Sequence, residues 1–237
     1  MTNKEAYSLA SVLLTEQEYR GKDATGIFTD GRIIKAPLTA KEFMPYLPHE
    51  FGSVTLLHNR SATSGSEWNN FNNHPLFSDN WVLIHNGVLK MQRLANYPYK
   101  GEVDSEILLS YIETEGLENA LTKVEGSAAI ACAKHEGKTI YLWHNSYPLK
   151  LGYVPNKCII FASLADSILK AVYGTFPLKF KIFPEVFLSD TNEEELLKVT
   201  KTAITSLGVF KSKSTSSHGI WRDGWKEYTK PTVNNEN

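Results

Sequence analysis

The chain has 237 residues, of which 42% are hydrophobic and 22% are charged, and its formal net charge is −1. This composition is ordinary for a soluble globular protein of one large or two small domains. The small net charge provides no basic field for nucleic acid, and no apolar run is long enough to span a membrane. The first residues lack the features of a signal peptide, so we expect a soluble, intracellular protein without nucleic-acid or membrane partners.

The first half of the chain is expected to alternate short helices with short strands. Apolar residues at helical spacing predict a helix over residues 4–19, with Asn3 as its N-cap. Asp30-Gly31 is a strong turn signal and predicts a hairpin. The further expected elements are strands over 24–29, 32–35, 51–57 and 81–84 and helices over 39–46, 103–115 and 117–124.

From Ser127 onward the hydrophobic pattern changes to a two-residue period and to continuous apolar runs. The pattern predicts four strands in meander order, over 127–133, 139–143, 150–154 and 159–162. A helix over 165–173, a strand over 178–182 and a helix over 193–205 are expected to follow. Two blocks of strands with helices around them predict an α+β domain with two sheets and helices outside.

The last residues differ in composition from the rest of the chain. Residues 211–219 read KSKSTSSHG, a linker composition, so we expect a domain over 1–210 and a linker with an aromatic tail over 211–237. Trp221 and Trp225 in this tail either anchor a protein partner or fold back on the domain.

Two charged residues near predicted strand and helix ends are candidates for binding a small molecule. Arg60 follows a predicted strand and suits a bidentate grip on a carboxylate, although a surface or ion-paired arginine has the same pattern. Asp104 either stabilises the N-terminus of its helix or holds a substrate ammonium group.

A second candidate feature is Asn86-Gly87, directly after a predicted strand. This pair forms an ordinary turn, or it supplies a side-chain amide and a backbone N–H to an oxyanion. His58, His74 and His85 do not have metal-ligand spacing on one element, so we expect no metal site. Cys132 and Cys158 lie in hydrophobic strand patterns and are interpreted as small buried hydrophobic residues.

Taken together, eight motifs follow one another in a specific order. They are YRGKDATGI at 19–27, HNRSATSG at 58–65, NNHP at 72–75, HNGV at 85–88, VDSEIL at 103–108, EGSAAIA at 125–131, YPLKLGY at 147–153 and IFASLADSIL at 160–169. This series resembles the class II glutamine amidotransferases, the glutaminase domains of the N-terminal-nucleophile hydrolase superfamily. The resemblance covers residues 4–173 and is strongest to short stand-alone forms, including those in bacteriophage genomes.

The resemblance implies a four-layer αββα sandwich and glutamine, or a related small molecule, as ligand, without a cofactor. Asn86 and Gly87 match the oxyanion-hole pair of the family. Arg60 matches the residue that holds the α-carboxylate of glutamine, and Asp104 matches the residue that binds its α-amino group.

Three further residues belong to the implied substrate site. Arg20 and Asp23 match a motif that shapes the site near the nucleophile, and Thr63 lies in the motif that contains Arg60. In that motif the family usually has an aromatic residue and a histidine where this chain has Ser61 and Ser64.

The chain also departs from the family at its start. Family members begin with a cysteine on a short strand, whereas Met1 is here followed almost directly by a helix, and Thr2 is a weak candidate nucleophile. We therefore expect a binding or structural module without glutaminase activity; the alternative is an active glutaminase whose first strand precedes these residues. Without that strand, another segment, a second copy or a larger assembly is expected to cover the open sheet edge.

Overall fold

The computed structural model describes residues 1–176 and 185–213. The described helices are α1 (Asn3–Gln17), α2 (Ala40–Phe43), α3 (Asp104–Glu115), α4 (Leu117–Thr122) and α5 (Ala165–Thr175). The described strands are β1 (Ala24–Thr29), β2 (Arg32–Ala36), β3 (Thr55–Arg60), β4 (Leu76–Phe77), β5 (Trp81–Leu89), β6 (Gly126–Lys134), β7 (Ile140–His144), β8 (Lys150–Val154), β9 (Cys158–Ala162), β10 (Phe187–Asp190), β11 (Glu195–Val199) and β12 (Ile204–Val209).

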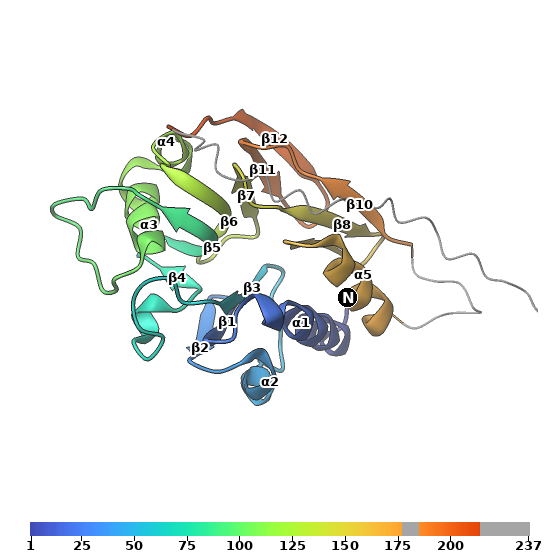
Figure 1. Cartoon of the computed structure of the whole chain (residues 1–237). Helices are drawn as coiled ribbons and strands as arrows, with labels where there is room; N and C mark the ends of the chain where they lie inside the picture. Colours follow the sequence, from blue (N-terminus) through green and yellow to red (C-terminus); the bar gives the residue numbers. More distant parts are fainter. Residues whose placement is uncertain (177–184, 214–237) are drawn as a thin grey trace, which may run out of the picture.

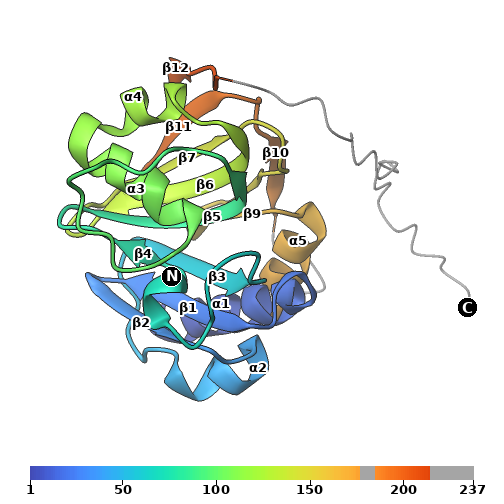
Figure 2. The ribbon, with the colours of Figure 1, turned by 60° about the vertical axis from the view of Figure 1, so that its left-hand side comes forward.

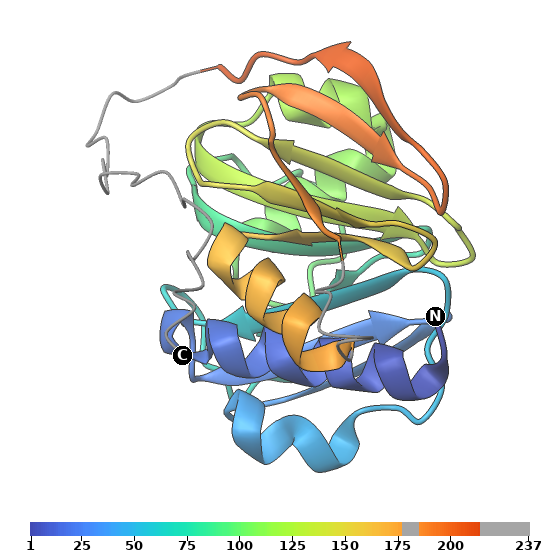
Figure 3. The same cartoon turned by 90° about the vertical axis from the view of Figure 1, so that its right-hand side faces the viewer.

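Helices cover two central layers of strands, as Figures 1 and 2 show. One layer is a six-stranded sheet in the order β12-β11-β7-β6-β5-β4, and α3 and α4 pack on its outer face. The other layer consists of two three-stranded sheets, β2-β1-β3 and β10-β8-β9. The helices α1 and α5 lie side by side on the outside of this second layer (Figure 3). The expected four-layer αββα sandwich is confirmed.

The core is divided between the layers in the way that the strand patterns require. Leu83, Ile130 and Cys132 point from the six-stranded sheet toward α3 and α4, whereas Ile84 and Ala131 point toward the second strand layer. Because the strands of the six-stranded sheet are covered on both faces, they carry nearly continuous apolar runs instead of strict alternation.

The helix ends depend on local side-chain caps. Thr39 caps α2, and α1 begins one residue earlier than expected because Thr2, and not Asn3, is its N-cap. The Thr2 hydroxyl accepts a hydrogen bond from the Glu5 N–H at 3.2 Å, and the Glu5 carboxylate accepts one from the Thr2 N–H at 2.7 Å. This reciprocal capping box satisfies two backbone donors that the Asn3 cap would leave open. Asn3 instead accepts a hydrogen bond from the Phe51 N–H.

Two predictions about the second half of the chain are wrong. The expected helix over 193–205 is the hairpin β11–β12, because β11 pairs with the edge of β7 and extends the six-stranded sheet. The expected meander is interrupted, because β6–β7 and β8–β9 are hairpins in different layers. Both errors concern long-range pairing, which local periodicity does not encode. The expected strand over 178–182 and the residues Trp221 and Trp225 lie outside the described residues.

None of the helices in the described part of the chain combines the length and the hydrophobicity that crossing a membrane requires.

The hairpin β11–β12 is expected to contribute to the stability of the whole domain. Leu196 is fully buried against Trp143 and its neighbours, so Leu196→Ala should lower the free energy of unfolding by about 2–4 kcal/mol in urea titrations. Val209 on the same hairpin is 62% exposed, and Val209→Ala should change this free energy by less than about 0.5 kcal/mol. Equal effects of the two substitutions would contradict the placement of β11.

Candidate functional site

A cavity of about 370 Å³ lies between the two strand layers. Residues from α1, β3, β5, β6 and β9 line it. Six of the seven candidate site residues are among the lining residues: Arg20, Arg60, Thr63, Asn86, Gly87 and Asp104. Asp23 is not in the lining; its carboxylate accepts a hydrogen bond from the Ala62 N–H at 2.7 Å and so supports the loop behind Arg60. The fold therefore brings residues from distant parts of the sequence to one cavity.

The pairing of β5 with β6 directs alternate backbone groups of β5 toward the cavity. Gly87 is opposite Ala128, and both the N–H and the carbonyl of Ala128 bond to Asn145 on the other side of β6. In an antiparallel pair, the backbone N–H and C=O groups of two facing residues either bond each other or point away from the partner strand on both sides. Because the Ala128 groups point away from β5, the Gly87 N–H points away from β6. The His85 carbonyl and the Leu89 N–H point the same way and are bound by His58 and Asp104.

Asn86 and Gly87 are not a turn, as one sequence interpretation had it, because β5 continues through both residues. The Asn86 side chain lines the cavity, and its amide has no hydrogen-bond partner among the described residues. Gly87 has φ +147°, and an added Cβ would lie 2.0 Å from the Ser127 carbonyl oxygen, so only glycine fits. A side-chain amide and a backbone N–H thus adjoin the same cavity, the arrangement of donors that stabilises an oxyanion.

Arg60 is the last residue of β3, not a loop residue after the strand, and it is buried. Its guanidinium donates to the Asn73 side-chain oxygen at 3.1 Å and to the carbonyls of Ser64 and Gly65. These bonds hold the polar crossing between β3 and β5 in place. A guanidinium has five N–H donors, so Arg60 retains donors for a ligand while it organises the loop.

Two asparagines in the crossing between β3 and β5 have a specific structural role. Asn72 and Asn73 are fully buried. Asn72 bonds to Ser66 and to the Glu102 N–H, and Asn73 bonds to the Glu67 carbonyl and to Arg60. Their amides replace the regular backbone pairing that this long crossing lacks.

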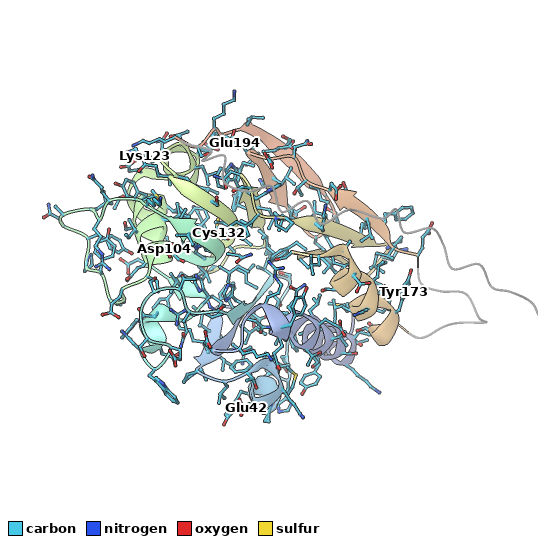
Figure 4. The ribbon with its side chains drawn as sticks, in the orientation of Figure 1. Glu42, Asp104, Lys123, Cys132, Tyr173 and Glu194 are labelled. Atoms are coloured by element: carbon cyan, nitrogen blue, oxygen red, sulfur yellow. The ribbon has the colours of Figure 1, made fainter. Side chains whose placement is uncertain are left out.

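Asp104 begins α3 at the point where that helix meets the end of β5 (Figure 4). One carboxylate oxygen accepts from the Leu89 N–H at 2.7 Å, and the other accepts from the Ser105 N–H at 2.8 Å. The helix N-terminus favours the negative charge at this position. The Ser105 hydroxyl also donates to this second oxygen, at 3.4 Å, whereas the oxygen that binds Leu89 keeps a lone pair and can also accept a hydrogen bond from a cationic ligand group.

A cluster of three histidines forms part of the cavity wall. The sequence had raised these histidines only as candidate metal ligands. The His58 and His74 rings lie 4.3 Å apart, and the His74 and His85 rings 6.5 Å apart. The His85 Nδ1 lies 2.7 Å from the Ser105 hydroxyl, whereas both ring nitrogens of His74 have no partner. No group of metal-ligating residues that could hold an ion occurs among the described residues.

Burial of these rings opposes their protonation. Desolvation lowers the pKa of His58 to about 4, and it lowers the pKa values of His74 and His85 as well. Neutral imidazoles therefore face the cavity at neutral pH.

The two cysteines and Thr2 lack the features of an activated nucleophile. Cys132 faces the α3 side of the six-stranded sheet, and burial raises the pKa of its thiol. Cys158 lines the cavity at the start of β9, and burial raises its pKa to about 11. A thiol with a raised pKa is a poor nucleophile at neutral pH. Thr2 is occupied by the cap of α1.

Comparisons with known proteins agree with this fold. A family model described as "Glutamine amidotransferase domain" matches residues 69–170. The glutamine--fructose-6-phosphate aminotransferase of Streptococcus pyogenes is 32% identical over 173 residues, which cover 63% of this chain and 29% of that enzyme. The corresponding Listeria monocytogenes enzyme is 30% identical over 179 residues, with coverages of 66% and 30%. The match thus spans less than a third of the length of these relatives.

Solved structures show the same architecture. The glutamine phosphoribosylpyrophosphate amidotransferase of Bacillus subtilis superimposes with a TM-score of 0.62 at 18% identity, over 88% of this chain and 47% of that one. A structure described as the allosteric regulatory enzyme of purine biosynthesis gives a TM-score of 0.65 over the same fractions, also at 18% identity. The resemblance to the class II glutamine amidotransferases and the N-terminal-nucleophile hydrolase fold are confirmed, and the chain carries a glutamine amidotransferase-like domain.

Replacing Gly87 should damage both the fold and the site. Gly87→Ala places a Cβ against the Ser127 carbonyl and should lower the free energy of unfolding by at least about 2 kcal/mol in denaturant titrations. Gly174 lies in α5, and an added Cβ there would meet only the Val12 Cγ2 atom at 3.6 Å, an ordinary van der Waals contact. Gly174→Ala should therefore change the free energy of unfolding by no more than about 1 kcal/mol. Similar losses for both variants would contradict the close approach at Gly87.

The histidine cluster should make the protein sensitive to acid. The unfolded chain binds protons near pH 6.5, whereas folded His58 resists protonation to about pH 4, so the free energy of unfolding should fall as pH falls through this window. His58→Gln should reduce this slope by roughly 1 kcal/mol per pH unit, measured by urea titrations at several pH values. Asn119→Ala, a substitution of an exposed residue that does not titrate, should leave the slope unchanged. An unaltered slope in the His58 variant would contradict the burial argument.

Proposed function

We propose that the cavity binds glutamine, or a closely related α-amino acid with a side-chain amide, and that these 237 residues bind it without hydrolysing it. The observation that carries the proposal is the pair of donors at the open edge of β5. The Asn86 amide and the Gly87 N–H can both donate to the side-chain carbonyl oxygen of a bound glutamine.

The two ends of an α-amino acid find complementary charges in the same cavity. Arg60 has donors left for the α-carboxylate, and Thr63 beside it supplies a hydroxyl. The Asp104 carboxylate oxygen that binds the Leu89 N–H has a lone pair left for the α-ammonium group. Neighbouring carboxylates, including that of Asp104, interact with the Arg60 guanidinium, so the two charged groups belong to one electrostatic environment. Arg20 in the cavity wall and Asp23 behind it would support the loop that carries Thr63.

Binding without hydrolysis follows from the absence of a suitable attacking group among the described residues. Amide hydrolysis by covalent catalysis needs an activated thiol or hydroxyl within reach of the carbonyl carbon. Cys158 lines the cavity but burial raises its pKa to about 11, and the Thr2 hydroxyl is held in the cap of α1, so neither is an activated nucleophile. The alternative, an active glutaminase, uses the same donors and requires a nucleophile beyond the described residues.

Isothermal titration calorimetry tests the binding. Asn86→Ala should weaken glutamine binding about tenfold, because a hydrogen bond to the carbonyl is lost and a polar group is left unpaired. Asn119→Ala, at an exposed position on α4, should leave the affinity unchanged. Absence of glutamine binding to the parent protein at about 10 mM, well above usual substrate affinities, would sink the proposal.

A coupled ammonia assay on the same samples separates the two forms of the proposal. The parent protein should bind glutamine and release no ammonia above the buffer rate. Ammonia release that Asn86→Ala abolishes would instead establish the active glutaminase.

A further inference from the structure

The last residues of the crossing, 73–75, lie directly on the three-stranded sheet β2-β1-β3. Lys35 of β2, Gly26 of β1 and His58 of β3 are aligned in register across this sheet. An added Cβ on Gly26 would lie only 2.1 Å from the His74 carbonyl oxygen. The glycine therefore makes the room that residues 73–75 occupy against the sheet, because any side chain there would push them away.

The Lys35 side chain binds both ends of this segment. Its ammonium group donates to the Asn73 carbonyl at 2.6 Å and to the Pro75 carbonyl at 2.9 Å. Burial lowers the pKa of Lys35 to about 8, so the group is still mostly protonated at pH 7 and both bonds are charge-assisted. The Lys35 carbonyl in turn accepts a hydrogen bond from the Asn70 side chain at 2.9 Å. One residue of β2 thus holds the crossing at three points.

Asn73 connects Lys35 to the arginine of the site. Its backbone carbonyl binds Lys35, whereas its side-chain oxygen accepts from the Arg60 guanidinium at 3.1 Å. The Asn73 side-chain amide also donates to the Glu67 carbonyl at 2.7 Å and to the Asn70 side chain at 2.9 Å. Because Asn73 is fully buried in close-packed surroundings, a displacement of its backbone moves its side-chain oxygen and the guanidinium bound to it.

We propose that Lys35 is a positioning residue that gives the site its requirement for an α-carboxylate. It fixes the Asn73 backbone, Asn73 fixes the Arg60 guanidinium, and the remaining Arg60 donors are thereby directed at the carboxylate. This role rests on the proposed binding of glutamine. Lys35 is not among the residues that line the cavity, so it acts on the ligand only through Asn73 and Arg60.

The other groups proposed to bind glutamine are held independently of Lys35. Asp104 is fixed by two backbone N–H groups, at the end of β5 and at the start of α3. Asn86 and Gly87 are fixed by the pairing of β5 with β6. A change at Lys35 should therefore affect the carboxylate end of the ligand and leave the ammonium and amide ends unaffected.

Ligand titrations monitored by NMR spectroscopy at pH 7 test this selectivity. Lys35→Met keeps an apolar stem and removes the ammonium group. It should weaken glutamine binding about tenfold, whereas the affinity for 4-aminobutanamide, which is glutamine without its carboxylate, should change less than about twofold. Lys41→Met, at an exposed position of α2, should leave both affinities unchanged. A structural role alone would weaken both ligands to the same extent.

A second measurement needs no ligand. The N–H groups of Asn72 and Asn73 are bonded within the crossing, so their hydrogen exchange reports on its order. Mass spectrometry of unliganded Lys35→Met should show at least about tenfold faster exchange in residues 66–75, and unchanged exchange in α1 and α5. If Lys35→Met does not fold, Lys35→Gln, which is shorter and uncharged, replaces it in both experiments with the same expected results.

Three results would overturn the proposal. They are an unchanged glutamine affinity in Lys35→Met, an equal weakening of both ligands, and unchanged exchange in residues 66–75. Failure of the proposed function is a separate result, because a parent protein that binds no glutamine is recognised before any variant is compared. In that case faster exchange would still support the link from Lys35 to Asn73, and unchanged exchange would overturn it.

Discussion

The antiparallel pairing of β5 with β6 determines which backbone groups face the cavity, and the site depends on it. With Gly87 opposite Ala128, the His85 carbonyl, the Gly87 N–H and the Leu89 N–H all point away from β6. A shift of the pairing by one residue would turn all three groups into the sheet and would direct the Asn86 side chain to the opposite layer. The close approach of Gly87 to Ser127 helps to fix this pairing, because no other residue fits there.

The groups around this edge serve the fold and the site together. Asp104 binds the Leu89 N–H and starts α3, and His58 binds the His85 carbonyl from β3. Arg60 organises the crossing between β3 and β5 through Asn73. Because these side chains are already held by protein groups, a ligand would meet them in fixed positions and would bind at a smaller entropic cost.

The second strand layer shows how an incomplete sheet can persist. Its two halves share no strand pair in the described residues, yet α1 packs on both: Leu14 lies in one apolar cluster with Ile27 of β1, and Leu9 lies in another with Ile160 of β9. Burial against the helices and against the six-stranded sheet therefore replaces the hydrogen bonds between the halves. The same arrangement leaves the unpaired edges accessible from within the cavity.

The sequence by itself determined the elements that local physics encodes. The hairpin at Asp30-Gly31, the Thr39 cap and the strands β8 and β9 follow from turn chemistry, capping and periodicity, and the order of motifs identified the fold through a family resemblance. The helix expected over 193–205 is wrong, because pairing with β7 decides the conformation of this segment.

Only the tertiary structure decided how the candidate residues are used. It showed that Asn86 and Gly87 lie within a strand, that Arg60 supports a loop while it lines the cavity, and that three histidines from separate segments form one wall. It also showed two strand edges on one cavity that have no strand partner among the described residues. These features arise from contacts between residues far apart in the chain, and the free energy of such contacts depends on the positions that the whole fold gives them, which local sequence patterns do not contain.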